Sequence, residues 1–488
     1  MINENILMSD LNGVHIHFVG IKGTGMAALV EIVHARGAVI TGSDVPEQFY
    51  TDEILKKLNV KVYTSFDAKN IDSQVQFVIY SAAYKREENP ELIEADKRHI
   101  PVMLYTEALG EVSALAYSCG IAGVHGKTTT TGLTGTLLKQ LNLPAQVLAG
   151  SIISSFGNTC TLNNGNNYFV AETCEYQRHF MSFHPKKIIL TSVESDHEDF
   201  YPTYESIRDA FVDYILLLPE NGQLIYCADD KGAAEVADII SRKRGDIELI
   251  PYGTSAKGDY SIKIGQIKDG HQFFKIGAFD GELALRIPGE HMIRNAAAAC
   301  ALSIELFKNF SKCKDLDAAT KAKVFKNLKD GLEAFTGAKR RGEIIADING
   351  IIIMDDYAHH PTAIATTLEG LRKFYPERRI IVDFMSHTYT RTAALLDRFA
   401  GAFGAADEVI LHKIYPSARE KYDGTVTGRI LYERTKQNHP KVSYYEEILD
   451  ALPYVSSIVK PGDLFITMGA GDNWKIGKAL IEQLTKRK

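Results

Sequence analysis

The sequence has few cysteines, and none of them belongs to a CxxC motif. Its 488 residues contain six, scattered from Cys119 to Cys313. Disulfide frameworks and structural zinc sites depend on closely or regularly spaced cysteines. We therefore expect reduced thiols, most of which pack in the core.

The chain also lacks a long apolar run and a block of basic residues. No stretch has the length of a membrane span, and the start MINENILMSD has no basic flank followed by an apolar segment. The formal net charge is −6, which gives no electrostatic footprint for nucleic acid or an anionic membrane. We expect a cytoplasmic protein with no membrane insertion and no nucleic-acid partner, whose ligands are small anions.

What the sequence does contain is a regular alternation of strand-like apolar runs with helical patterns. This alternation is typical of α/β domains, and the length exceeds what one core serves. We predict three domains: residues 1–113, Rossmann-like; 114–336, a central P-loop ATPase-like domain with a mostly parallel sheet; and 337–488, Rossmann-like. Runs near 259–287 are separated by short turns and predict antiparallel strands within the central domain.

A glycine-rich segment, GIAGVHGKTT (residues 120–129), follows a short apolar strand and opens an amphipathic helix. This is the context of a phosphate-binding loop, in which glycines let backbone N–H groups turn toward phosphate oxygens. Lys127 supplies a cation to the β- and γ-phosphates, and the Thr128 hydroxyl can bind Mg²⁺. Ile121 stands where the common GxxxxGK[ST] pattern has its first glycine. We predict an ATP site, with an incidental glycine-rich helix start as the alternative.

A second glycine-rich turn, GIKGTG (residues 20–25), lies between a strand and a helix, and Asp44 ends the next strand. It is compatible with a nicotinamide dinucleotide, with the diphosphate of a UDP sugar, or with a tight packing turn. The independent phosphate loop favours the UDP sugar.

Acidic residues and a histidine end two strands of the central domain. They are Glu172, Glu175, Glu194, Asp196 and His197. Parallel strands end at one edge of a sheet, so these side chains converge beside the phosphate loop, which suits a metal site.

The third domain ends two of its strands in polar motifs. DDYAHHP (residues 355–361) follows a wholly apolar strand, and HTYTR (387–391) ends the next one. Arg391 is a candidate clamp for a carboxylate, because a guanidinium donates two parallel hydrogen bonds.

Four separated motifs together resemble the Mur ligase superfamily. They are VGIKGTGMAAL (19–29), GVHGKTTTT (123–131), DDYAHHPTAI (355–364) and HTYTRT (387–392). The resemblance covers nearly the whole chain and is greatest to the branch that adds alanine. It implies ATP-dependent ligation of L-alanine to the carboxylate of UDP-N-acetylmuramate through an acyl phosphate, with Mg²⁺ or Mn²⁺, for peptidoglycan synthesis. We expect a monomer or a weak homodimer.

The resemblance also assigns residues. It implies ATP binding by Gly123, His125, Gly126, Lys127, Thr128, Thr129, Asn295, Arg340, Arg341 and Asp356. It implies UDP-sugar binding by Gly20, Gly23, Gly25, Met26, Ser43, Asp44 and Ser81. It implies metal binding by Thr128, Glu175 and His197, and amino-acid binding by Tyr357, His359 and Arg391. The catalytic residues are then Lys127, His197, His359 and Arg391.

The residues themselves qualify what the resemblance implies at three places in the chain. Lys22 replaces a glycine that is usual in the family. Residues 339–341 would by default form a solvated linker, whereas a hinge that brings guanidinium groups to the γ-phosphate suits phosphoryl transfer. His359 is a hypothetical aid in keeping the attacking amine neutral.

Other functions remain open at this point. The nearest is a sister ligase that adds a whole peptide to UDP-N-acetylmuramate during cell-wall recycling. A nicotinamide-dependent oxidoreductase built on residues 20–25 and a non-catalytic, nucleotide-sensing regulator are more remote.

Overall fold

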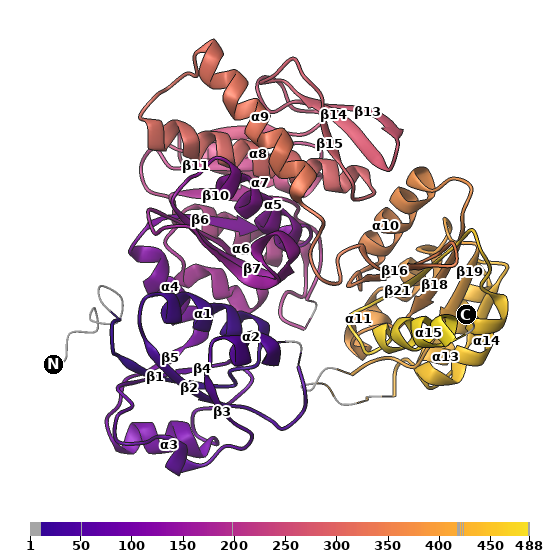
Figure 1. Ribbon diagram of the computed structural model, residues 1–488, viewed down its shortest axis with the longest axis horizontal. Coiled ribbons are helices and arrows are strands. Elements are labelled where there is room, and N and C mark those ends of the chain that lie inside the picture. Colours follow the sequence, from indigo (N-terminus) through magenta and orange to yellow (C-terminus); the bar gives the residue numbers. More distant parts are fainter. Residues whose placement is uncertain are drawn as a thin grey trace.

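The computed structural model describes residues 11–49, 51–197, 199–416, 420, 422 and 424–486. The chain forms three α/β domains in sequence order, and the third lies beside the central one (Figure 1). Each of the three large sheets is built mainly from parallel strands. This is the predicted fold class. The predicted boundary at residue 113 falls in the last turn of a helix, and the one at 336 follows a helix that ends at residue 334.

The first sheet has five parallel strands in the order β3-β2-β1-β4-β5. The strands are β1 (His15–Val19), β2 (Val39–Ser43), β3 (Lys61–Tyr63), β4 (Phe77–Tyr80) and β5 (Val102–Leu104). The helices are α1 (Thr24–Ala35), α2 (Asp52–Lys57), α3 (Pro90–Lys97) and α4 (Tyr105–Ala114). The strand order reverses beside β1, so the turn after β1 lies at the crevice where such sheets bind ligands.

The central sheet has seven strands in the order β12-β11-β10-β6-β9-β7-β8, and only β8 runs antiparallel. The strands are β6 (Tyr117–Ala122), β7 (Ala145–Ile153), β8 (Thr159–Asn163), β9 (Tyr168–Glu172), β10 (Lys187–Leu190), β11 (Gln223–Cys227) and β12 (Glu248–Tyr252). The helices are α5 (Lys127–Gln140), α6 (Tyr204–Ile215), α7 (Lys231–Lys243), α8 (Glu290–Ser311) and α9 (Ala318–Ala334). Because β6 pairs with both β9 and β10, the loop after β6 meets the ends of those two strands.

A small antiparallel sheet follows the central one, as the short turns in this region predict. It consists of β13 (Ile262–Lys268), β14 (His271–Ile276) and β15 (Leu283–Leu285). Short 3₁₀ helices elsewhere in the chain are η2 (Ala68–Asn70), η3 (Ser154–Phe156), η4 (Tyr176–Ser182) and η5 (Ile448–Ala451).

The third sheet has the order β16-β17-β21-β18-β19-β20, with β16 antiparallel at one edge. The strands are β16 (Glu343–Ile348), β17 (Ile351–Asp356), β18 (Arg379–Phe384), β19 (Glu408–Leu411), β20 (Val442–Tyr444) and β21 (Asp463–Met468). The helices are α10 (Pro361–Phe374), α11 (Tyr389–Ala394), α12 (Leu396–Gly401), α13 (Gly428–Lys436), α14 (Leu452–Ile458) and α15 (Trp474–Lys486).

The apolar core is continuous through the first two domains but not into the third. Helix α1 packs against β7 and β8, and buried side chains of both domains form one cluster. The third domain has its own two clusters, one on each face of its sheet. Its contacts with the central domain include hydrogen bonds such as Thr362 to Glu194 and Lys373 to Glu290. Domains joined by polar contacts move relative to one another more readily than domains that share a core.

The cysteines and the helices of the structure bear on the expectations drawn from composition. All six cysteines are free thiols, and Cys119, Cys160, Cys227 and Cys300 are buried, as expected of packing residues. Within the described residues, every helix is too short or too polar to cross a lipid bilayer.

Candidate active site

The phosphate loop connects β6 to α5 and is fixed by the end of β10. The N–H groups of Val124 and His125 donate to Ser192, and the Thr191 hydroxyl donates to the carbonyl of His125 at 2.5 Å. Gly126 caps α5 at φ +82°, and a Cβ there would lie 2.6 Å from the Asn295 side chain. Only glycine meets both the left-handed backbone and the close approach. The loop is therefore held at the N-terminus of a 14-residue helix, a site suited to phosphate.

Lys127 is the first residue of α5, and its ammonium contacts a buried carboxylate. Its Nζ lies 2.8 and 3.0 Å from the two Glu175 oxygens and donates to the Gly123 carbonyl. Burial acts to lower the pKa of Lys127, but the negative charges around it, that of Glu175 foremost, and the hydrogen bond to Glu175 together raise the pKa. The residue therefore stays cationic, as a phosphate ligand must.

Thr128 contacts Glu172, the acid that ends β9. Its hydroxyl donates to Glu172 Oε2 at 2.9 Å, and the same oxygen accepts from Gly150 N. Glu175 lies on the other side of Lys127, where His197 Nε2 approaches it at 3.4 Å. Glu172 thus joins the three predicted metal ligands, and the four residues form two adjoining pairs, Thr128 with Glu172 and Glu175 with His197. One hydroxyl, two carboxylates and one imidazole form an oxygen-rich donor set that fits Mg²⁺ or Mn²⁺.

His197 occupies a strained backbone conformation at φ +59°. Asp196 Oδ1 accepts from the His197 N–H at 2.8 Å, and the imidazole packs on Tyr176 with ring centroids 4.8 Å apart. A non-glycine residue in the left-handed backbone region costs about 1 kcal/mol or more of stability. Such a conformation persists where the surrounding structure fixes it, often at functional sites.

The two hinge arginines have different roles in the structure. Arg341 reaches the phosphate loop, with a contact of 3.5 Å from its NH2 to the Thr128 hydroxyl. Arg340 instead donates to Asp355 Oδ2 at 2.8 Å and to the Gly469 carbonyl at 2.8 Å, inside the third domain. Both were predicted to bind ATP. Because the guanidinium of Arg340 is committed to that domain, we retain only Arg341 as a proposed ATP ligand.

The end of β17 brings three predicted residues to the same place. Asp356 accepts from the backbone N–H groups of Gly342 and Ala358, and burial raises its pKa to about 6. The Tyr357 ring lies 5.1 Å from the Arg341 guanidinium and also 5.1 Å from the His359 ring.

His359 is a neutral imidazole in this environment. Burial is the main cause that lowers its pKa well below the ordinary value. Nδ1 lies 2.8 Å from the Tyr357 carbonyl, so the proton belongs on Nδ1 and Nε2 is an acceptor. A lowered pKa suits an acceptor that orients an amine better than a base that removes its proton.

Arg391 forms an ion pair across the domain boundary. Its Nε and NH2 donate to Asp196 Oδ1 at 3.0 and 2.7 Å, and NH1 lies 3.4 Å from His387 Nδ1. Burial acts to raise the pKa of Asp196, but the positive charges around it, that of Arg391 foremost, and the hydrogen bond from Arg391 together hold the pKa far below the ordinary value. The ion pair with Asp196 therefore fixes the plane of the Arg391 guanidinium, which still has N–H groups free to donate to a ligand.

One cleft of about 840 Å³ connects these groups between the central and third domains. The predicted residues that line it are His125, Gly126, Lys127, Thr128, Thr129, Glu175, His197, Asn295, Arg341, Asp356, Tyr357, His359 and Arg391. The volume is that of a typical site for a nucleotide-sized ligand. Phosphate-binding, metal-binding and carboxylate-binding groups thus face one space.

The glycine turn of the first domain lies apart from this cleft. Gly20, at φ +83°, is covered by the Tyr84 ring, which a Cβ would approach to 2.6 Å. Tyr84 in turn donates to Asp44 Oδ1 at 3.1 Å, and the buried Ser43 hydroxyl donates to Glu91. Gly23 caps α1, whose first residues include Gly25 and the buried Met26. Ser81 follows β4, and its N–H donates to the carbonyl of Val19 in β1. Their role in UDP-sugar binding stays a prediction.

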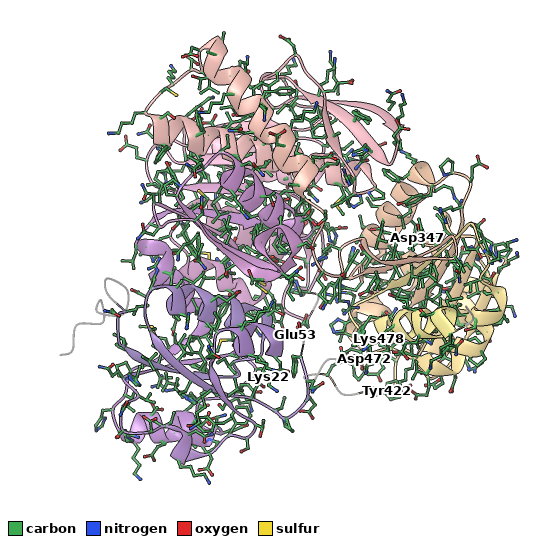
Figure 2. All side chains as sticks on the ribbon, in the orientation of Figure 1. Lys22, Glu53, Asp347, Tyr422, Asp472 and Lys478 are labelled. Atoms are coloured by element: carbon green, nitrogen blue, oxygen red, sulfur yellow. The ribbon has the colours of Figure 1, made fainter. Side chains whose placement is uncertain are left out.

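Lys22 has a structural role that its position in the turn does not reveal. Only 5% of it is exposed, and Nζ donates to the carbonyls of Val45 and Glu47 at 2.9 and 2.8 Å. Its backbone N–H donates to Asp44 at 2.7 Å. Figure 2 shows Lys22 on the side of the first domain that faces the third. The lysine thus fixes the loop after β2 instead of projecting toward a diphosphate.

Replacing this lysine should therefore destabilise the first domain. We expect Lys22→Met to lower the free energy of unfolding by about 1–3 kcal/mol, because two carbonyls lose a buried donor. Chemical denaturation measures the change. Lys85→Met is the control, since that side chain is 71% exposed in its ion pair with Glu88. Equal effects of the two substitutions would contradict the assignment.

Acid should weaken the protein through His360. Burial is the main cause that lowers the His360 pKa from 6.5 to about 4. Between those values the unfolded chain binds a proton that the folded chain lacks, so stability falls as pH drops from 6.5 to 4. We expect a lower denaturation midpoint at pH 5 than at pH 7, and a smaller difference in His360→Gln. An unchanged difference in that variant, with His271→Gln as control, would refute the assignment.

The sequence does not predict which side chains contact Thr128 and Arg391. It places Glu172 and Asp196 at strand ends, and this position is the one sequence feature that indicates their part in the site. No pattern in the sequence indicates that Tyr84 covers Gly20.

The family relationship of the chain is shown by three domain matches. The Mur ligase family catalytic domain matches residues 15–117, the Mur ligase middle domain 121–303, and the Mur ligase glutamate ligase domain 340–471.

Individual relatives agree with these matches. The UDP-N-acetylmuramate–L-alanine ligase of Treponema pallidum is 50% identical over 97% of this chain and 98% of its own. The crystal structure of UDP-N-acetylmuramate–alanine ligase from Thermotoga maritima has a TM-score of 0.75 at 25% identity, covering 97% of this chain and 100% of that one. A murein peptide ligase from Psychrobacter arcticus has the same fold, with a TM-score of 0.65 at 22% identity over 97% and 99%. This chain belongs to the Mur ligase family.

Proposed function

We propose that this protein joins L-alanine to the carboxylate of UDP-N-acetylmuramate, converting ATP to ADP and phosphate, in peptidoglycan precursor synthesis. The observation that carries the proposal is the shared cleft, in which the phosphate loop of the central domain faces Arg391 of the third. The high identity to the Treponema ligase over nearly the full length supports the same substrates. Since ATP and UDP sugars are cytoplasmic nucleotides, the reaction belongs in the cytoplasm.

In the first step a carboxylate oxygen of UDP-N-acetylmuramate attacks the γ-phosphorus of ATP, and ADP leaves. Lys127 and Arg341 supply positive charge where the transferring phosphoryl group becomes more negative. Thr128, Glu172, Glu175 and His197 would hold Mg²⁺ or Mn²⁺, which when bound neutralises phosphate charge. The product of this step is an acyl phosphate.

In the second step the neutral amine of L-alanine attacks the acyl carbon, inorganic phosphate leaves from the tetrahedral state, and the proton lost by the nitrogen passes to the departing phosphate. Arg391 binds the alanine carboxylate, and its orientation is fixed by Asp196. His359 Nε2 accepts a hydrogen bond from the amine and so directs the nitrogen toward the acyl carbon.

The third domain contributes Arg391 and His359, whereas the central domain contributes the phosphate loop. The second step therefore needs the two domains in contact. The polar interface between them allows the domains to separate for substrate entry and product release.

Release of phosphate from ATP, measured with each substrate omitted in turn, tests the proposal. We expect release only when UDP-N-acetylmuramate and L-alanine are both present. Release with L-alanyl-γ-D-glutamyl-diaminopimelate in place of alanine would indicate the recycling ligase. Hydride transfer to a nicotinamide without ATP, or ATP binding without any release, would indicate the oxidoreductase or the regulator.

A further inference from the structure

A group of two histidines and one glutamate lies between the phosphate loop and the third domain. His125 belongs to the loop, Glu194 follows β10, and His360 caps α10. Each offers one ligand atom, and the three atoms lie within 4.8 Å of one another. Among the described residues, no other group of three or more His, Cys, Asp or Glu side chains brings its ligand atoms close enough together to surround one ion.

The two oxygens of Glu194 have different partners. Oε1 faces both imidazoles, at 2.5 Å from His125 Nε2 and 3.7 Å from His360 Nδ1. Oε2 accepts from the Thr362 hydroxyl at 2.9 Å and lies 3.4 Å from the Arg398 guanidinium. The second oxygen is thus fixed by an outer layer of donors, as is common for carboxylates that bind metals.

The protonation states also suit metal binding. Burial acts to raise the pKa of Glu194, but the hydrogen bond from His125 and the positive charges around it lower the pKa to about 2. His360 is 1% exposed and has a pKa of about 4. Its Nδ1, which faces Glu194, accepts a long hydrogen bond of 3.4 Å from the Thr362 N–H, and its Nε2 has no hydrogen-bond partner. Near pH 7 the group therefore offers an ionised carboxylate and an unprotonated imidazole without loss of a proton from either.

We infer that His125, Glu194 and His360 bind a divalent transition-metal ion of the Zn²⁺ class. Two imidazoles and one carboxylate form a donor set that Zn²⁺ accepts readily and Mg²⁺ does not. The site is chemically distinct from the oxygen-rich group around Thr128. His125 Nε2 and Glu194 Oε1 now lie at hydrogen-bond distance. When an ion binds, these two atoms move apart to the wider spacing of two ligands on the same ion.

Such an ion would tie the phosphate loop to the N-terminus of α10. It adds coordinate bonds to an interface otherwise made of polar contacts, so it stabilises the closed arrangement of the central and third domains. Because the proposed function needs those domains to separate, zinc should slow turnover. This consequence rests on the proposed function, whereas the binding site does not.

Equilibrium dialysis of the full chain against Zn²⁺, in excess Mg²⁺, tests the site directly. We expect one Zn²⁺ per chain. Glu194→Gln and His360→Gln should each weaken binding more than about 100-fold, because each removes a ligand. Thr362→Val removes only an outer-layer donor and should weaken binding by about 10-fold. Melting curves of the zinc-free proteins establish that each variant is folded.

Two control variants separate this site from other histidines. His271 pairs with Glu333 at 3.2 Å at the surface, and His197 belongs to the proposed magnesium ligands. We expect His271→Gln and His197→Gln to keep the bound zinc. The inference is overturned if the wild-type chain binds no stoichiometric Zn²⁺, if both ligand variants bind it normally, or if His197→Gln abolishes binding. If Glu194→Gln and His360→Gln lose Zn²⁺ binding but keep ATP turnover, the zinc site is supported whether or not the proposed function is correct.

Discussion

Lys127→Met should lower kcat for phosphate release by about 10³-fold or more, because one fixed cation at a transferring phosphoryl group contributes on this scale. The effect should fall on kcat, since the charge of the transferring group is best matched in the transition state. Steady-state release of phosphate at saturating substrates measures it.

The same substitution removes the partner of Glu175, which is 2% exposed. An unpaired buried carboxylate destabilises the fold, so the assay must be run well below the melting temperature of the variant. Lys139→Met is the matched control, because Lys139 is an exposed residue in the last turn of the same helix. A kcat within twofold of wild type in Lys127→Met would exclude Lys127 from phosphoryl transfer.

Arg391→Lys should raise the KM for alanine by about 100-fold, equal to about 3 kcal/mol, because lysine keeps the charge but loses the fork that binds a carboxylate. The KM for ATP should change little, since Arg391 lies on the opposite wall of the cleft from the phosphate loop. Initial rates with each substrate varied in turn separate these effects.

Asp196→Asn tests whether the ion pair orients the arginine. It should raise the KM for alanine less than Arg391→Lys does, because the guanidinium stays but loses its charged partner. Arg398→Lys is the control, since that side chain is 49% exposed at the same domain boundary. An unchanged KM for alanine in Arg391→Lys would remove this residue from amino-acid binding.

The α/β organisation and the phosphate loop could be predicted from the sequence because both depend on local pattern. Glycines before Lys127, at the end of an apolar strand, specify a loop whatever the rest of the fold is. The short turns near residues 259–287 likewise specified antiparallel strands. In each case the residues that determine the structure are neighbours in the chain.

The pairing of acids with their partners could not be predicted in this way. Glu172 and Glu175 follow the same strand, and the parallel register of β6 with β9, which pairs Ile121 with Glu172, decides which of them meets Thr128. Arg340 and Arg341 are adjacent, yet they point to different domains because Arg340 takes a left-handed backbone at φ +59°. Which acid and which arginine reach the phosphate loop depends on strand register and on backbone conformation, and local sequence patterns specify neither.

Contacts between distant segments were the least predictable. Asp196 and Arg391 are 195 residues apart and belong to different domains, so nothing near either of them indicates the ion pair. Lys22 is another case, since its ammonium turns back to the loop after β2 and not toward a ligand.

The central step of the proposed reaction is the passage of the muramoyl carboxylate through an acyl phosphate, and an isotope experiment tests this step directly. UDP-N-acetylmuramate labelled with ¹⁸O in both carboxylate oxygens is turned over with ATP and L-alanine, and the inorganic phosphate is analysed by mass spectrometry. We predict one ¹⁸O atom in each phosphate released, because the oxygen that attacks the γ-phosphorus leaves with it. Phosphate free of the label would contradict the mechanism.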